Sequence, residues 1–307
     1  RDSYALARGD RAEAAELWPL VEWCLEYCRR QLTADGVVAS DTDELEGRFP
    51  TGDANLCTST LYYDALLSAV SLGRELGVES AQTARYAAQA RALARAIDAH
   101  FGGEVGGYDT YRYYAGNTLL RSWICMPLIV GLKERSEGTV RALLGPELMT
   151  DDGLLTQQGS STFWDRSTLY ALRGIYNVGQ ADRATELLHR YSQRRLLGDH
   201  VPYPIEAWPE GSQRHLSAES GLYCRIITEG LFGIRPTGLR SFDLTPSMPA
   251  AWESMSLRHI RAFGSDFDIT VARVADGRLR ITVARPGAKP KIYRAAPGAT
   301  IRVKLTD

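Results

Sequence analysis

The hydrophobic pattern of this chain changes its period once, at a segment rich in residues that interrupt regular structure. Before Gly233, apolar residues recur every three or four positions, which is typical of amphipathic helices. After Gly238, apolar and polar residues alternate, which indicates half-buried strands. The segment between them holds Pro236 and is closed by a glycine at each end. The sequence therefore predicts a helical domain over residues 1–235 and a C-terminal β-domain over residues 236–307.

Helical periodicity is clear in about eight stretches of the first domain. In the first stretch, Val21, Leu25 and Cys28 share one face, and Asp35-Gly36 ends it. The predicted helices cover about residues 13–32, 54–76, 80–101, 118–132, 137–145, 165–178, 181–195 and 219–232. The predicted strands cover residues 256–263, 266–274, 279–283, 291–294 and 300–304.

Acidic and aromatic residues concentrate in every second loop of the helical domain, in residues 36–53, 104–117, 153–166 and 198–218. In a ring of helical hairpins, alternate loops lie at the same end of the ring. Loops held on a rigid scaffold often carry binding residues. We therefore expect these four loops to meet at one functional surface.

Composition excludes several classes of partner. The net charge of −1 provides no electrostatic attraction to nucleic acid or to an anionic membrane. No uncharged apolar run approaches the length of a membrane span. The five cysteines are an odd number and argue against a disulfide framework. Cys24 and Cys28 share a helix face, but no His or Cys pair completes a metal site, so we expect buried thiols and no metal.

The first loop is strongly acidic, with Asp41, Asp43, Glu44 and Glu46 within six residues. Carboxylates this close raise one another's pKa. A glycosidase needs one carboxylic acid that stays protonated near neutral pH, so that it can donate to the leaving oxygen. A solvated acidic loop and a calcium site are the alternatives, although the EF-hand spacing is absent.

The fourth loop holds Glu206 between prolines, beside Trp208. Proline fixes the backbone, so the loop is expected to be rigid. A rigid glutamate next to an aromatic ring suits a general base beside a sugar platform. A structural loop with solvated acids is the alternative.

Three further clusters have the mixed aromatic and charged character that suits sugar binding. Aromatic faces stack on sugar C–H groups, and charged side chains bind hydroxyls. Asp165 is also a candidate N-cap of the following helix. The residues of these clusters are Tyr108, Asp109, Trp164, Asp165, Arg166, His215 and Glu219.

The common motifs of other enzyme classes are absent from the sequence. It contains no Walker A motif, no GxGxxG and no HExxH. The GxSxG nucleophile elbow is also absent. Nucleotide binding, zinc proteolysis and serine hydrolysis therefore have no support in the sequence.

The order of these loops resembles the six-hairpin (α/α)6 glycosidases, most closely glycoside hydrolase family 63 and its bacterial α-glucosidase-like relatives. The family's Ser-Gly-Met-Asp-Asn loop followed by Arg is similar to Ser40–Glu44 followed by Arg48, with Asp41 in place of the glycine and one extra residue. Tyr108-Asp109 matches a Tyr-Asp pair. The helix start at Trp164 matches with Asp165 inserted, and the Glu206 loop looks like a shortened form of the family's base loop. The resemblance covers about residues 10–232, and the same segment also looks like the later half of the rhamnosidase-type toroids.

The resemblance implies a mainly α fold, an (α/α)6 toroid followed by a small antiparallel β-sandwich-like domain. It also implies a glycosidase without a cofactor, inverting and exo-acting on oligosaccharides. Asp43 would be the general acid, with Glu44 and Glu46 as alternatives, and Glu206 would be the general base. The implied substrate-binding residues are Arg48, Tyr108, Asp109, Trp164, Asp165, Arg166, Trp208, His215 and Glu219.

A complete toroid of this type has twelve helices, and this chain is predicted to have about eight. We therefore expect an upstream segment or a partner chain to supply the first hairpins, and the acid itself could lie there. Relatives are often periplasmic or secreted, which leaves the location of this chain open.

Two other functions stay open at this point. A polysaccharide lyase or sugar epimerase on a similar toroid would use Tyr203 with His215, or Tyr111 with Arg112, and a lyase would release a product that absorbs ultraviolet light. A non-catalytic carbohydrate-binding protein would bind sugars without turning them over.

Overall fold

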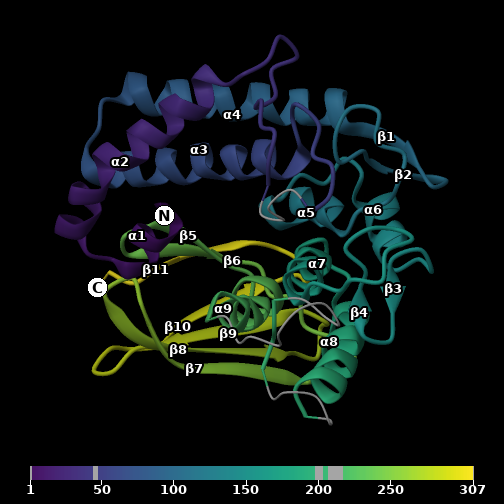
Figure 1. Cartoon of the computed structure of the whole chain (residues 1–307). Coiled ribbons are helices and arrows are strands. Elements are labelled where there is room, and N and C mark those ends of the chain that lie inside the picture. Colours follow the sequence, from purple (N-terminus) through teal and green to yellow (C-terminus); the bar gives the residue numbers. More distant parts are fainter. Residues whose placement is uncertain (1, 44–47, 198–202, 207–216, 307) are drawn as a thin grey trace.

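The computed structural model of this chain describes residues 2–43, 48–197, 203–206 and 217–306. Helices α2, α3 and α4 lie side by side at the top of Figure 1, and strands β7 to β10 lie at the bottom. The helices are α1 (Asp2–Arg8), α2 (Arg11–Arg30), α3 (Leu56–Leu76), α4 (Ser80–Phe101), the 3₁₀ helix η1 (Ser122–Cys125), α5 (Met126–Val130), α6 (Ser136–Leu143), α7 (Asp165–Asn177), α8 (Ala181–Arg195), α9 (Ser217–Arg225) and the π-helix η2 (Ile226–Leu231). The strands are β1 (Gly102–Val105), β2 (Tyr108–Tyr111), β3 (Met149–Thr150), β4 (Gly153–Leu154), β5 (Ile234–Gly238), β6 (Ser241–Leu244), β7 (Ser254–Ala262), β8 (Ser265–Arg273), β9 (Leu279–Ala284), β10 (Lys291–Ala295) and β11 (Ile301–Lys304).

The helices begin and end where the sequence supplies capping residues. The Asp10 carboxylate accepts the backbone N–H groups of Ala12 and Glu13 and so starts α2. Asn55 caps α3 in the same way by accepting the N–H of Thr58. Gly77 ends α3 with a φ of 79°, a left-handed conformation that glycine adopts without strain. Most predicted helices are confirmed close to their expected bounds. The helix predicted over residues 118–132 is instead η1 followed by the five-residue α5, and the helix predicted over residues 219–232 ends in the π-helix η2.

The helices form two layers. Helices α3, α5, α7 and α9 contact one another in that order, and α2 and α4 pack on α3 while α8 packs on α7. The loop before α3 follows α2, and the loop before α9 follows α8, so each of these two loops leads from the layer of α2, α4 and α8 to the layer of α3, α5, α7 and α9. A closed six-hairpin ring stays a prediction.

Two antiparallel sheets make up the C-terminal part, with strand orders β10-β9-β8-β7 and β11-β6-β5. Phe242 on β6 stacks on Phe263 and on Phe267 of β8, with ring centroids 5.0 and 5.5 Å apart. These rings are buried and join the two sheets face to face. The predicted antiparallel strands are thus confirmed, whereas the division into two domains at residue 235 stays a prediction.

Several elements differ from the expectation. Helix α1 was not predicted, and its end is held by the sheet, since Phe263 and Gly264 donate backbone N–H groups to Ala7 and Arg8. A Cβ on Gly9 would lie 2.3 Å from the Gly264 nitrogen, so the approach requires glycine. Strand β5 occupies the segment predicted as a boundary, the unpredicted β6 follows it, and the aromatic loop contains the hairpin β1–β2.

The cysteines follow the expectation only in part. Cys57 and Cys125 are buried, and burial raises the pKa of Cys125 to about 12. Cys24 and Cys28 are half-buried, and Cys224 is exposed, which contradicts its expected burial. All five are free thiols. No helix in the described part of the chain is both long and apolar enough to cross a membrane.

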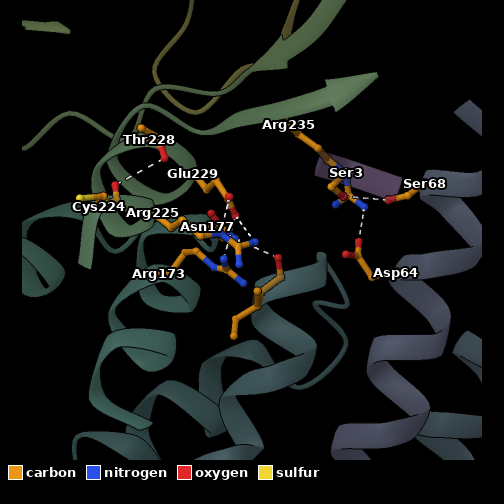
Figure 2. A network of polar contacts seen from close by, with 11 residues as sticks. Ser3, Asp64, Ser68, Arg173, Asn177, Cys224, Arg225, Thr228, Glu229 and Arg235 are labelled. Atoms are coloured by element: carbon orange, nitrogen blue, oxygen red, sulfur yellow. Dashed lines mark hydrogen bonds and ion pairs between the residues drawn. The ribbon is translucent and has the colours of Figure 1, made fainter. Parts of the chain in front are cut away.

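A polar network ties η2 to α7 and α3 to β5 (Figure 2). The nearly buried Arg173 donates to Glu229 at 2.8 Å, and Arg225 donates to both carboxylate oxygens of Glu229 at 2.5 and 2.9 Å. Arg235 donates to Asp64 at 2.8 Å. These contacts join α7 and α9 to η2, and they join α3 to β5, the first strand of the sheet region.

Candidate functional site

The alternate loops of the helical part meet one another. Short antiparallel bridges join Asn55 to Tyr114 and Arg121 to Gln157, and so connect the loops that precede α3, η1 and α7. The described part of the fourth loop joins them through a hydrogen bond from Ile205 to Asp165. The prediction that these loops converge is confirmed for the parts of the loops that these contacts join.

Hydrogen bonds fix the two described parts of the acidic loop, residues 36–43 and 48–53. The Asn55 side chain, which caps α3, also donates to the Thr42 carbonyl at 3.0 Å. Thr51 donates its hydroxyl to the Asp41 carbonyl at 2.8 Å. The Tyr113 hydroxyl donates to Asp43 Oδ2 at 2.6 Å. Asp43 is thereby placed above the start of α3, half-buried and oriented.

Arg121 lies in the same place and is 0% exposed. Its Nη2 donates to the Pro50 carbonyl at 2.5 Å and its Nε to Gln157 at 2.9 Å. The guanidinium lies 4.9 Å from the centroid of the Tyr113 ring and 5.1 Å from that of Phe49. Burial lowers the pKa of Arg121, and the nearby Tyr113 and Asp43 oppose that effect. We call Asp43, Phe49, Tyr113 and Arg121 the acidic-loop cluster.

Sequence reasoning missed Arg121 and did not single out Tyr113. The signal for Arg121 is its isolation as a charge between apolar residues, since Leu119 and Leu120 precede it and Trp123 and Ile124 follow closely. A charged side chain in such a run is buried only when it is paired or hydrogen-bonded.

A second cluster forms around Trp164, which is 1% exposed. The guanidinium groups of Arg48 and Arg166 lie 5.5 and 5.6 Å from its ring centroid. Arg166 donates its Nε and Nη2 to Glu219 Oε1 at 2.8 and 2.7 Å, and Glu219 is fully buried. We call Arg48, Trp164, Arg166 and Glu219 the Trp164 cluster. The predicted residues are together, but Trp164 supports two arginines and does not present an open stacking face.

Asp165 connects this cluster to the loop of the predicted base. It is 1% exposed, and its Oδ2 accepts the backbone N–H of Ile205 at 2.7 Å. Arg195 Nη2 lies 3.1 Å from Asp165 Oδ1. Burial raises the pKa of Asp165, while Arg195, the Ile205 N–H and Tyr191 oppose that rise. Glu206, half-buried, directly follows Ile205. Asp165 therefore points inward and is not placed to contact a substrate at the surface.

Tyr108 and Asp109 lie elsewhere. The turn at Gly106 and Gly107, with φ values of 59° and 81°, folds β2 back along β1 and directs both residues toward α6. Tyr108 donates to Glu147 at 3.3 Å, and Asp109 pairs with Arg135. The structure does not bring these two predicted substrate-binding residues to the clusters, because the hairpin pairing decides their direction.

Four further predicted residues, Glu44, Glu46, Trp208 and His215, lie outside the described residues. Within the described part of the chain, no three His, Cys, Asp or Glu side chains gather in a way that could hold a metal ion.

The two clusters adjoin because Arg48 and Phe49 are consecutive, and the Trp164 cluster adjoins Glu206 through Asp165. The site thus gathers carboxyl groups from separate loops beside guanidinium groups on one end of the helical array. Such an arrangement can bind polar groups and move protons.

Comparison with known proteins finds no family model and no curated protein that matches the chain. Solved structures do match. A protein titled sialidase has a TM-score of 0.72 at 15% identity, over 97% of this chain and 31% of that chain. The GH78 family rhamnosidase of Bacillus sp. GL1 has a TM-score of 0.60 at 16% identity, over 96% and 31%. The Streptomyces avermitilis α-L-rhamnosidase complexed with L-rhamnose has a TM-score of 0.54 at 14% identity, over 98% and 32%.

These similarities cover nearly the whole of this chain, which spans about one third of the length of those proteins. At such identities they show a shared fold. The chain therefore shares the fold of this part of those proteins, helical hairpins followed by antiparallel sheets.

Proposed function

We propose that this chain carries the catalytic acid and base of a glycoside hydrolase. The observation that supports this best is the series of contacts that links the loop of Asp43 to the loop of Glu206 through Phe49 and the Arg48–Trp164–Arg166–Glu219 arrangement. The fold shared with a sialidase and two rhamnosidases adds to it. Membership of family 63 and exo-action on oligosaccharides belong to the same proposal.

In the proposed reaction, Asp43 protonates the glycosidic oxygen and Glu206 removes a proton from the attacking water. Tyr113 binds Asp43 Oδ2 and so orients the carboxyl group. An inverting reaction needs the two carboxyl groups about 6.5–9.5 Å apart, so that water fits between them. Because a guanidinium such as Arg121 opposes the protonation of a neighbouring carboxyl group, Glu44 and Glu46 stay alternatives for the acid.

The remaining side chains have binding roles in this proposal. Arg48 and Arg166 would donate to sugar hydroxyls, and Glu219 would hold Arg166 in place through its two hydrogen bonds. Trp208 and His215 are proposed to complete the sugar site from the fourth loop. No step of this reaction requires a metal or an organic cofactor.

The test is the Glu206→Gln variant, assayed with the parent chain on a panel of aryl glycosides. Loss of the base is expected to lower kcat by about 10²–10⁴-fold with the fold intact. Glu186→Gln, an exposed glutamate on α8, is the matched control and should behave as the parent. Activity of Glu206→Gln close to that of the parent would rule out the assignment, and proton NMR of the first product anomer distinguishes inversion from retention.

A further inference from the structure

We propose that Asp165 is a positioning residue, which fixes the backbone of residues 203–206 and through it the direction of Glu206. This inference rests on the proposed function for Glu206, and it assigns Asp165 a task other than the substrate contact expected from the sequence. The basis is the junction between α7, α8 and the fourth loop.

The first step is the hydrogen bond between Asp165 and the fourth loop. Ile205 donates its backbone N–H to Asp165 Oδ2 at 2.7 Å, across forty residues of sequence. Both partners are buried, since Ile205 is 0% and Asp165 1% exposed. A buried N–H that lost this acceptor would raise the free energy of the folded state, because it would have neither a protein partner nor water. The hydrogen bond therefore favours the position of the loop next to Asp165. The bond is also one residue from Glu206.

The second step is the rigidity of Asp165 itself. It lies in the first turn of α7, and its other oxygen is 3.1 Å from Arg195 on α8. Arg195 is nearly as buried, and its Nη1 donates to the Asp152 carbonyl at 2.9 Å. Tyr191, also buried and also on α8, opposes the rise in the pKa of Asp165. The acceptor for Ile205 is therefore held by two helices.

The third step excludes the more direct roles. A carboxyl group with 1% exposure, whose Oδ2 accepts from Ile205 and whose Oδ1 lies 3.1 Å from Arg195, is not accessible to a sugar or to an attacking water. Glu206 is half-buried and follows the anchored residue. Small displacements of a catalytic group cost rate without greatly changing affinity, which separates a positioning role from a binding role.

The experiment compares Asp165→Ala and Asp165→Asn with the parent chain. Asparagine keeps an oxygen that can accept from Ile205, whereas alanine keeps none. In Asp165→Ala, kcat is expected to fall by about 10²-fold with KM nearly unchanged, and Asp165→Asn should recover part of that loss. The control is Asp182→Ala, which removes an exposed aspartate that accepts the backbone N–H of Ala250 in a different loop and should leave kcat unchanged.

A second measurement does not depend on activity. Hydrogen exchange of the Ile205 amide, followed by NMR, should be slow in the parent and faster in Asp165→Ala, with Asp165→Asn between them. Exchange in the parent at the rate of an exposed amide would overturn the proposal even if Asp165→Ala does not fold. So would an equal loss of kcat in the alanine and asparagine variants with Ile205 still protected. If the parent hydrolyses no glycoside while Ile205 behaves as expected, the proposed function fails and the anchoring role stands.

Discussion

Tyr113 donates its hydroxyl hydrogen to Asp43 Oδ2 at 2.6 Å, and the two residues are seventy positions apart in the sequence. Tyr113 is fully buried, and its ring also lies against the Arg121 guanidinium. Burial raises the pKa of Tyr113 far above its usual value, so the hydroxyl remains a donor. This contact orients the carboxyl group that we propose as the general acid.

Replacement of Tyr113 by Phe should lower kcat/KM by about 10-fold or more, because a hydrogen bond to a charged group contributes about 1.5–3 kcal/mol. The ring, and with it the packing on Arg121, is retained. Tyr108→Phe is the matched control, since Tyr108 donates to Glu147 away from the two clusters. Steady-state kinetics give kcat/KM for both variants. If the two variants have the same kcat/KM, Tyr113 does not assist Asp43.

Three single variants, Asp43→Asn, Glu44→Gln and Glu46→Gln, identify the acid. The variant that removes it should lose about 10²–10⁴-fold in kcat on substrates with poor leaving groups. The loss should shrink for aryl leaving groups that need little proton assistance. We expect this pattern for Asp43→Asn, and its appearance in either glutamine variant instead would transfer the role to that glutamate.

Removal of the Glu229 carboxylate should destabilise the fold. Glu229→Ala leaves Arg173 buried without its ion-pair partner. The expected loss is about 3 kcal/mol, at the low end for a buried pair because Glu229 itself is about one-third exposed. Urea unfolding measures it. Glu26→Ala, which breaks two ion pairs on the exposed face of α2, should change the midpoint little, and a similar shift in both variants would contradict the prediction.

The pH dependence of the stability should show the raised pKa of Asp165. Burial raises its pKa in the folded state, so the unfolded chain loses this proton first. Its contribution to stability is therefore complete below the ordinary Asp pKa of about 3.9, and it is lost as the pH rises through the raised value. The Tm of the parent minus that of Asp165→Asn should decrease as the pH rises from about 4. A difference that grows with pH would show that Arg195 outweighs burial.

The elements of this fold could be read from the sequence, because periodicity is a local property. The bounds of α4 and α8 agree with the predicted helices at residues 80–101 and 181–195, and the β-strands from β7 onward follow the alternation. Helix α1, β5 and β6 were missed because they are short. The contacts that hold α1 and β6 also come from distant parts of the chain, from Phe263 and Gly264 for α1 and from β11 for β6.

The sequence alone indicated which loops come together, because alternate loops in an array of helical hairpins share one end. It did not determine where each side chain points. Only the tertiary structure places Arg121 beside Asp43, covers Trp164 with two arginines and turns Tyr108 toward α6. It likewise buries Asp165 under Glu206's loop. Those directions depend on packing and hydrogen bonds between residues tens of positions apart, and neither periodicity nor motif spacing contains that information.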